Sequence, residues 1–206
     1  MILEGDTQWI KRPGQFVNIE LEGLYLRRPI SICDWDDKTI TIIYKVVGKG
    51  TEQMSQMQPG VELDVLTGLG NGFNPEPAVE NTKSLLVGGG VGVPPLYHLA
   101  KVLLAAGRKV SVVLGFNTAD EVFYAEEFRA LGVDVYVSTA DGSLGTKGFV
   151  TDAIRENGID FDYFYSCGPL PMLKALCGCT DKPGELSFEE RMGCGFGACM
   201  GCSCKT

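Results

Sequence analysis

The chain has 206 residues, of which 45% are hydrophobic and 21% charged, and its formal net charge is −8. The negative charge, with no cluster of Lys and Arg, argues against a nucleic-acid partner. No stretch approaches the roughly 18 apolar residues of a membrane span, and residues 1–5 lack the basic and apolar regions of a signal peptide. We therefore expect a cytoplasmic protein with neither a nucleic acid nor a membrane as partner.

Residues 1–78 carry short alternating segments, which predict an antiparallel β-barrel. In segments 15–20 and 38–46, apolar and polar residues alternate as they do in strands with one buried face. Pro13-Gly14 and Pro59-Gly60 supply turns at the short spacing of a small barrel. Because little chain precedes the first of these segments, we expect the amino end of the barrel to be clipped.

Residues 79–180 change to an alternation of strands and helices, which predicts a parallel sheet in an α/β domain. Strands are expected over 85–87, 110–114, 133–138 and 163–166, and helices over 93–106, 124–131, 149–157 and 169–176. Ligands of such sheets bind beyond the carboxyl ends of the strands. That rim then carries the segments 88–92, 115–117, 139–142 and 167–169.

A glycine-rich turn follows the first of these strands. Gly88, Gly89, Gly90 and Gly92 allow a sharp turn and a close approach of the backbone to a ligand. The next residues are two prolines, which suit the first turn of a helix, and the amino end of that helix can face a phosphate. The alternative is a tight turn that serves packing alone.

Four of the eight cysteines lie in the last thirteen residues, within the predicted third segment, 181–206. Cys194, Cys199 and Cys202 have the Cys-x4-Cys-x2-Cys spacing of the first three ligands of a plant-type [2Fe-2S] site. Zinc and reduced structural thiols are the alternatives. Because Cys204 follows Cys202 too closely to span a cluster easily, we expect the fourth ligand to be absent, with the carboxyl end clipped, or to be Cys204.

The first 78 residues also contain polar groups that suit a flavin nucleotide. Arg28, Pro29, Ile30 and Ser31 lie on a β segment, where Pro29 indicates an edge or a bulge. An arginine and a hydroxyl there could contact a diphosphate and a planar ring, although an exposed edge strand is equally consistent. The segments Ile43-Tyr44-Lys45 and Gly50-Thr51 could add a stacking surface and a phosphate cradle.

The motifs Arg-Pro-Ile-Ser, Ile-Tyr-Lys, Gly-Thr, Gly-Gly-Gly-Val-Gly-Val-Pro-Pro and Cys-Gly-Pro-x-Pro-Met, in this order, resemble the ferredoxin–NADP reductase superfamily. With the cysteine tail, nearly the whole chain resembles the electron-transfer subunits of class 1B, NAD-dependent dihydroorotate dehydrogenases. The resemblance implies FAD on Arg28, Pro29, Ile30 and Ser31, beside Ile43, Tyr44 and Lys45, with its diphosphate on Gly50 and Thr51. It implies NAD at Gly88, Gly89, Gly90, Gly92, Cys167, Gly168 and Pro169, and the [2Fe-2S] cluster on Cys194, Cys199 and Cys202.

The resemblance also implies the activity and the partner. FAD would exchange a hydride with NAD, and the cluster would connect FAD to the FMN of a catalytic subunit that oxidises dihydroorotate in pyrimidine biosynthesis, within a heterotetramer. No catalytic side chain is expected. The small subunit of an NADH-dependent ferredoxin:NADP oxidoreductase, which has an aspartate in place of Cys194, ranks second, with a sulfite or sulfide reductase subunit beside it. A zinc-bound, flavin-free interaction module is the alternative of another class. The direction of electron flow and the choice between NAD and NADP stay open.

Overall fold

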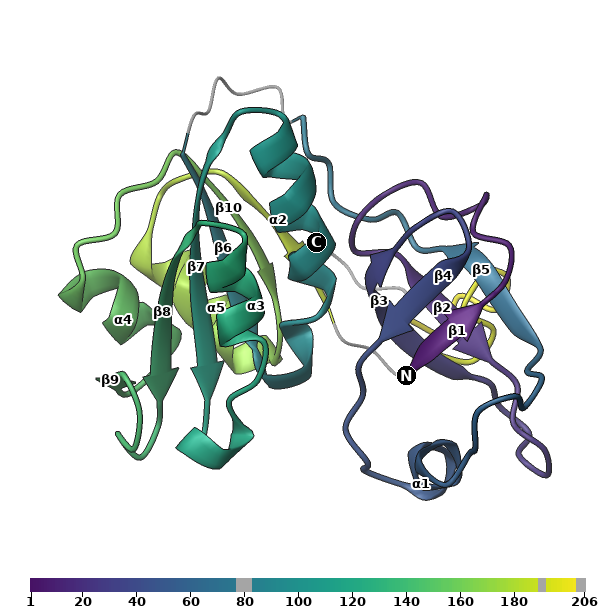
Figure 1. The fold of residues 1–206 in the computed structure, drawn as a ribbon. Coiled ribbons are helices and arrows are strands. Elements are labelled where there is room, and N and C mark those ends of the chain that lie inside the picture. The colour runs from purple at the N-terminus through teal and green to yellow at the C-terminus, as the bar shows by residue number, and fades with distance from the viewer. Residues whose placement is uncertain (77–82, 189–191, 203–206) are drawn as a thin grey trace. The chain divides into compact units, whose positions relative to one another are not determined.

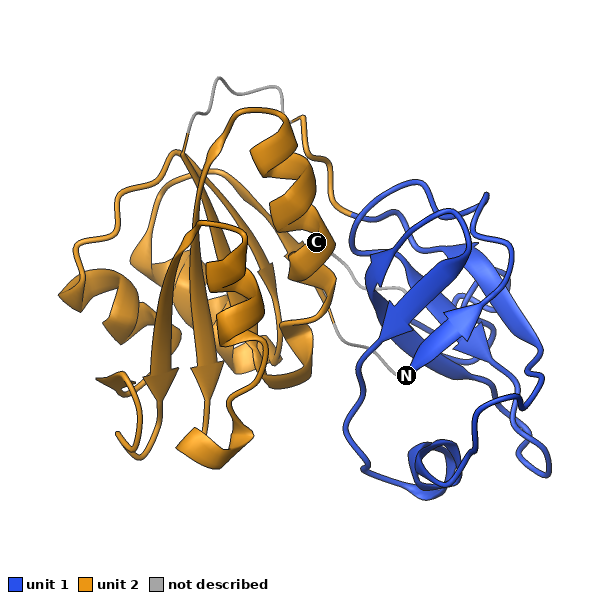
Figure 2. Ribbon diagram, in the orientation of Figure 1, with its two compact units in different colours: residues 1–72, 190–206 blue, residues 73–189 orange. Residues whose placement is uncertain are grey.

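The computed structural model describes residues 1–76, 83–188 and 192–202, so Cys204 lies outside the described residues. The chain divides into two compact units, shown in Figures 1 and 2. Unit 1 comprises residues 1–72 and 190–206, and unit 2 comprises residues 73–189. Across the described ranges, no helix is long and apolar enough to cross a membrane.

Unit 1 contains an antiparallel sheet of five strands in the order β1-β4-β3-β2-β5. The strands are β1 (Ile2–Glu4), β2 (Phe16–Ile19), β3 (Arg28–Trp35), β4 (Thr39–Ile42) and β5 (Val65–Leu69). Alternating apolar residues, among them Val17, Ile19, Ile32 and Ile42, turn to one side and form a buried core. β1 and β5 are the two edge strands and do not pair with each other, so the sheet is a half-barrel and not a closed barrel. Its antiparallel pairing agrees with the fold predicted for this part.

The predicted strand over 38–46 ends early, at Ile42. β4 pairs with β3 only from Ile32 onward, with a register shift between Ile32 and Asp34, whereas Arg28–Ser31 of β3 pairs with β2 alone. The alternating residues after Ile42 therefore have no strand to pair with, and the chain leaves the sheet. It continues to helix α1 (Lys49–Ser55), where we predicted only a glycine–hydroxyl turn.

Unit 2 contains a parallel sheet of six strands in the order β11-β10-β6-β7-β8-β9. The strands are β6 (Lys83–Gly89), β7 (Lys109–Phe116), β8 (Asp134–Thr139), β9 (Thr146–Lys147), β10 (Tyr163–Cys167) and β11 (Gly184–Ser187). The helices are α2 (Pro95–Ala105), α3 (Ala125–Ala130), α4 (Val150–Glu156) and α5 (Leu170–Cys179), with 3-10 turns η1 (Gly90–Gly92) and η2 (Ala119–Glu121). The predicted parallel α/β fold is confirmed, with each of the eight predicted elements present.

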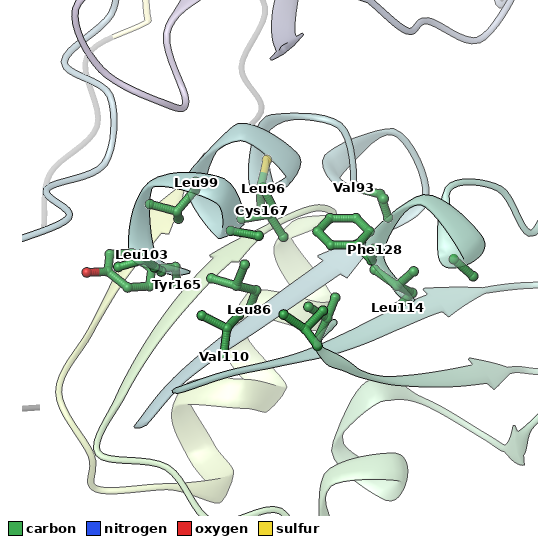
Figure 3. Packing of buried hydrophobic residues seen from close by; sticks show 14 of the residues in the cluster. Leu86, Val93, Leu96, Leu99, Leu103, Val110, Leu114, Phe128, Tyr165 and Cys167 are labelled. Carbon is green, nitrogen blue, oxygen red and sulfur yellow. The ribbon is translucent and has the colours of Figure 1, made fainter. Parts of the chain in front are cut away.

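Both faces of the parallel sheet are covered, as its nearly continuous apolar strands require. On one face, Leu86 and Leu114 pack against Leu96 and Leu99 of α2 and Phe128 of α3, as Figure 3 shows. On the other face, a second buried cluster joins Leu85 and Val87 to residues of α4 and α5. These two layers fix the carboxyl ends of β6, β7 and β8 at one rim.

The short strands β9 and β11 were not predicted. β11 pairs in parallel with β10, so the sheet continues past residue 180, into the segment that we assigned to the cluster. The described residues 192–202 belong to unit 1, with the half-barrel. The cluster segment thus begins after β11, and the functional assignment of the three predicted domains stays a prediction.

Candidate functional site

A cavity of about 350 Å³ lies at the carboxyl ends of β6, β7 and β8, where ligands of parallel sheets bind. Its described lining includes three of the predicted nucleotide residues, Gly89, Gly90 and Pro169. The others are Gly115, Phe116, Asn117, Glu121, Ser138, Ala140, Gly148, Phe149, Val150, Pro171, Met172 and Ala175. The topology predicted the contributions of 115–117 and 139–142. Nothing in the sequence singled out Phe149 or Met172.

The predicted glycines have different structural roles. A Cβ on Gly92 would lie 2.2 Å from the carbonyl oxygen of Cys167, and one on Gly88 would lie 3.0 Å from Cα of Val93. These two glycines permit close backbone packing, and Gly92 joins the turn to the predicted segment 167–169. Gly90 differs, because its φ is +53° and a Cβ there would have no neighbour within 4 Å. Gly90 is therefore the glycine of the turn where a side chain would have room to extend.

Polar groups in this cavity suit a nucleotide. The Ser138 hydroxyl is buried and has no hydrogen-bond partner within the described parts of the chain, so it is available to a bound polar group. The Phe149 side chain is 69% exposed although it lines the cavity, as expected for a ring that stacks on a base. Glu121 accepts hydrogen bonds from the backbone N–H of Asn117 at 3.2 Å and from its side-chain amide at 2.7 Å. Glu121 is the one charged residue in the described lining.

In unit 1 the structure separates the roles of two adjacent arginines. The Arg28 guanidinium lies against the buried Gly50, since a Cβ on Gly50 would be 2.0 Å from Nε of Arg28. Arg27 instead forms ion pairs with Glu20 and with Asp64, the latter at 2.8 Å. The hydrogen bond that Arg27 donates to Asp64 raises the pKa of Arg27, and the same bond lowers the pKa of Asp64. Arg28 is thus the arginine beside the predicted phosphate cradle.

The Thr51 hydroxyl shapes that cradle. It accepts the backbone N–H groups of Val47 at 3.0 Å and Gly48 at 3.2 Å, and it donates to the carbonyl of Gly48 at 3.0 Å. The hydroxyl therefore caps the start of α1, and the backbone beside it is left to face a ligand. Tyr44 packs on the half-barrel core, and burial raises its pKa, whereas Lys45 is exposed.

The predicted flavin strand, Arg28–Ser31, has a partner strand on one side only. Its pairs are Arg28 with Ile19, Pro29 with Asn18, Ile30 with Val17 and Ser31 with Phe16, all on β2. The segment 43–47, which carries Ile43, Tyr44 and Lys45, leaves the sheet on the other side. Within the described residues this edge is not occupied by another strand, which fits the binding of a planar ring between Arg28–Ser31 and the segment that departs.

The cysteine loop, residues 192–202, has no helix or strand. Backbone hydrogen bonds from Cys199, Phe196 and Ala198, with one from the Cys199 side chain, lower the pKa of Cys194 to about 6. Gly195 and Gly197 have φ values of +77° and +84°, which bend the backbone around the sulfur. A sulfur that accepts several N–H groups is the environment of a cluster thiolate, so Cys194 fits the role of one ligand of a [2Fe-2S] group.

Cys199 and Cys202 differ in their relation to Cys194. The backbone and the side chain of Cys199 form hydrogen bonds with the Cys194 sulfur. The sulfur of Cys199 itself would lie 3.4 Å from a Cβ on Gly193 and 3.5 Å from a Cβ on Gly201. Cys202 is half-buried and does not complete a set with them, because the described ranges contain no group of three potential metal ligands. The complete predicted ligand set, Cys194, Cys199 and Cys202, therefore stays a prediction.

A flavin-type half-barrel and a parallel sheet with a nucleotide cavity at its rim define an oxidoreductase with an NAD-binding domain. The family profile of the oxidoreductase NAD-binding domain matches residues 86–178. A relative from Fusobacterium nucleatum is 52% identical over 204 residues, which cover 95% of this chain and 78% of the relative. One from Bacillus mycoides is 52% identical over 211 residues, covering 99% and 81%. This chain belongs to the family that both represent, the electron transfer subunits of dihydroorotate dehydrogenase B (NAD(+)).

Solved structures share the fold of this chain. The structure of an NADH-dependent reduced ferredoxin-NADP oxidoreductase is 36% identical, with a TM-score of 0.81, and the match covers 93% of this chain and 71% of that one. The cytochrome P450 reductase of Amycolatopsis is 21% identical, with a TM-score of 0.69 and coverage of 85% and 60%. The second likeness is one of fold.

Proposed function

We propose that this chain transfers electrons between NAD and the FMN of a dihydroorotate dehydrogenase catalytic subunit, through FAD and a [2Fe-2S] cluster. The complex serves pyrimidine biosynthesis in the cytoplasm as a heterotetramer. The observation that carries the proposal is the identity of 52% to electron transfer subunits over nearly the whole chain. The nucleotide cavity, the open edge of Arg28–Ser31 and the N–H groups around Cys194 support it.

When bound, FAD supplies both hydride and single-electron exchange, and the cluster supplies single-electron exchange. The chain binds and orients these groups. Arg28 supplies positive charge beside Gly50 for the diphosphate. Ser31 lies on the part of β3 that has a partner strand on one side only, and Tyr44 lies on the segment 43–47 that leaves the sheet. At the other site, Gly89 and Gly90 let the backbone approach the pyrophosphate. Proton transfer by a side chain is not part of the proposal.

The cavity in unit 2 suits NAD(H) better than NADP(H). An adenosine 2′-phosphate is usually held by arginine or lysine. The described lining has Glu121 as its charged residue, and its carboxylate is held in place by Asn117. Like charges placed close together repel, so a 2′-phosphate that enters near Glu121 is disfavoured.

A second candidate is a small subunit of an NADH-dependent ferredoxin:NADP oxidoreductase, favoured by the structural match at 36% identity. The purified chain, loaded with FAD and cluster, is mixed either with an FMN-bearing dihydroorotate dehydrogenase subunit or with ferredoxin and NADP. We expect NAD-linked oxidation of dihydroorotate in the first mixture. Activity in the second mixture alone would favour the rival. A chain that binds zinc and no flavin would contradict both.

A further inference from the structure

Asn18 joins the cysteine loop to the half-barrel. Its neighbours on β2, Val17 and Ile19, point into the barrel core, so alternation directs Asn18 to the opposite face. There its amide Nδ2 donates to the carbonyl oxygen of Cys194 at 3.3 Å. A Cβ on Gly195 would lie 2.7 Å from the same nitrogen, so the glycine lets the loop approach this closely. Figure 1 shows the loop, in yellow, beside β2.

The bond to Asn18 fixes the orientation of one peptide group of the loop. In a trans peptide the C=O and the N–H point in opposite directions. When Asn18 holds the carbonyl of Cys194, it directs the N–H of Gly195 away from the barrel. The peptides that follow supply the N–H groups of Phe196, Ala198 and Cys199 that surround the Cys194 sulfur. Asn18 therefore sets the beginning of the hydrogen-bond array.

The same residue adjoins the predicted flavin strand. Asn18 is the strand partner of Pro29, and Phe16 is the partner of Ser31. A Cβ on Gly195 would also lie 3.6 Å from the Phe16 ring. β2 thus contacts Arg28–Ser31 along its edge and the cysteine loop with its outer face.

We propose that Asn18 is a positioning residue that holds the cysteine loop, and with it the cluster, in a fixed place relative to the flavin strand. The inference rests on the proposed function, because it requires the cluster. Outer-shell residues of this kind orient metal ligands and tune the bound metal without touching it.

The hydrogen bonding of Asn18 does not stabilise the half-barrel itself. The side chain is 2% exposed, and its Oδ1 has no hydrogen-bond partner in the described ranges. A buried polar atom without a partner is destabilising, and an apolar side chain of similar size avoids that cost. Leucine at this position should therefore leave the barrel at least as stable while it removes the bond to Cys194. This separates a positioning role from a structural one.

The test compares Asn18→Leu with Gln15→Ala in the full chain, loaded with FAD, iron and sulfide. Gln15 is the matched control: it is buried, and it bonds to Lys11, Arg12 and Gly70 rather than to the cysteine loop. For Asn18→Leu we expect iron release to a chelator to be roughly tenfold faster. Its reduced cluster should have a shifted EPR spectrum and a lower midpoint potential, with an unchanged or higher unfolding temperature. For Gln15→Ala we expect a lower unfolding temperature with parental iron release and EPR.

Gly195→Ala disturbs the contact between Asn18 and the cysteine loop from the side of the loop. It should accelerate iron release, because its Cβ would lie 2.7 Å from Nδ2 of Asn18 and because alanine is strained at a φ of +77°. If Asn18→Leu fails to fold, Asn18→Ala replaces it, since it removes the amide without adding bulk. Parental iron release and EPR in the Asn18 variant would overturn the inference. A parent chain that binds neither FAD nor a cluster would instead overturn the proposed function.

Discussion

The rim of the parallel sheet and the cysteine loop show two ways of building a cofactor site. The cavity at the rim is enclosed by the ends of buried strands, and two covered faces hold those strands in register. The cysteine loop has no regular secondary structure and is shaped by backbone hydrogen bonds around one sulfur, with Asn18 joining it to β2. The first site is formed by the fold, whereas we propose that the second is completed by the metal group it binds, as metal sites coupled to local folding are.

The largest expected effect tests the loop. Cys194→Ser removes the sulfur at which the N–H groups converge, so we expect complete loss of the cluster, with FAD content unchanged. Cys177→Ser is the control, because Cys177 is an exposed thiol on α5. Iron and sulfide analysis and the visible spectrum measure the result. A full cluster in Cys194→Ser would remove this cysteine from the ligand set.

Gly90→Val tests the preformed cavity. A β-branched side chain is strained at a φ of +53°. It would also extend into the space where the protein backbone and the pyrophosphate of the nucleotide approach each other. We expect the reduction of bound FAD by NADH to slow on the order of a hundredfold. Gly107→Val, at a φ of +75° after α2 and outside the described lining, introduces similar strain elsewhere. Equal rates of flavin reduction in the two variants would assign Gly90 a role in the turn alone.

Arg28→Ala and Arg27→Ala compare two neighbours with different surroundings. A charge-assisted contact of Arg28 with a diphosphate is worth ~1.5–3 kcal/mol, so we expect FAD to bind roughly tenfold or more weakly in Arg28→Ala. Arg27→Ala loses its pairs with Glu20 and Asp64 and should retain FAD. Flavin content after gel filtration and an FAD titration provide the measurements. Stronger FAD loss in Arg27→Ala would reverse the two assignments.

Glu121→Gln gives the smallest expected effect. Removing the negative charge while keeping the side-chain shape should narrow the preference for NADH over NADPH roughly fivefold, as expected for about 1 kcal/mol of repulsion. Glu127→Gln, on the exposed face of α3, is the matched control. Rates of flavin reduction with each nucleotide measure the preference. An unchanged ratio in Glu121→Gln would place the 2′-hydroxyl away from this carboxylate.

The two regions also differ in how far their sequences predict them. Every strand and helix predicted from Ser84 to Leu176 is present, because burial on two faces leaves a strong apolar pattern and glycines mark the helix ends. In unit 1 the predicted strand was wrong beyond Ile42. Alternation shows which side chains are apolar, but it does not show whether a partner strand continues beside them. Short elements such as β9 and β11 have too few residues to leave a periodic pattern.

The site residues divide in the same way. The glycine turn and the Arg-Pro-Ile-Ser segment were visible in the sequence, but Gly92 packs on Cys167, and Thr51 uses its hydroxyl to cap α1. These roles depend on contacts between distant segments, which spacing alone does not encode. The same holds for Phe149, Glu121 and Asn18, because no motif in the sequence marks them and their roles follow only from their positions in the fold.

We propose that electrons pass within this chain between NAD(H) and the cysteine loop by way of FAD, so that NADH can reduce the cluster through the flavin. The most direct test adds NADH under anaerobic conditions to the chain loaded with FAD and cluster, and follows flavin absorbance and the EPR spectrum together. We expect the flavin to bleach and the EPR signal of a reduced [2Fe-2S] cluster to appear, both more slowly in Gly90→Val. Bleached flavin with no cluster signal, in a sample whose cluster dithionite does reduce, would contradict it.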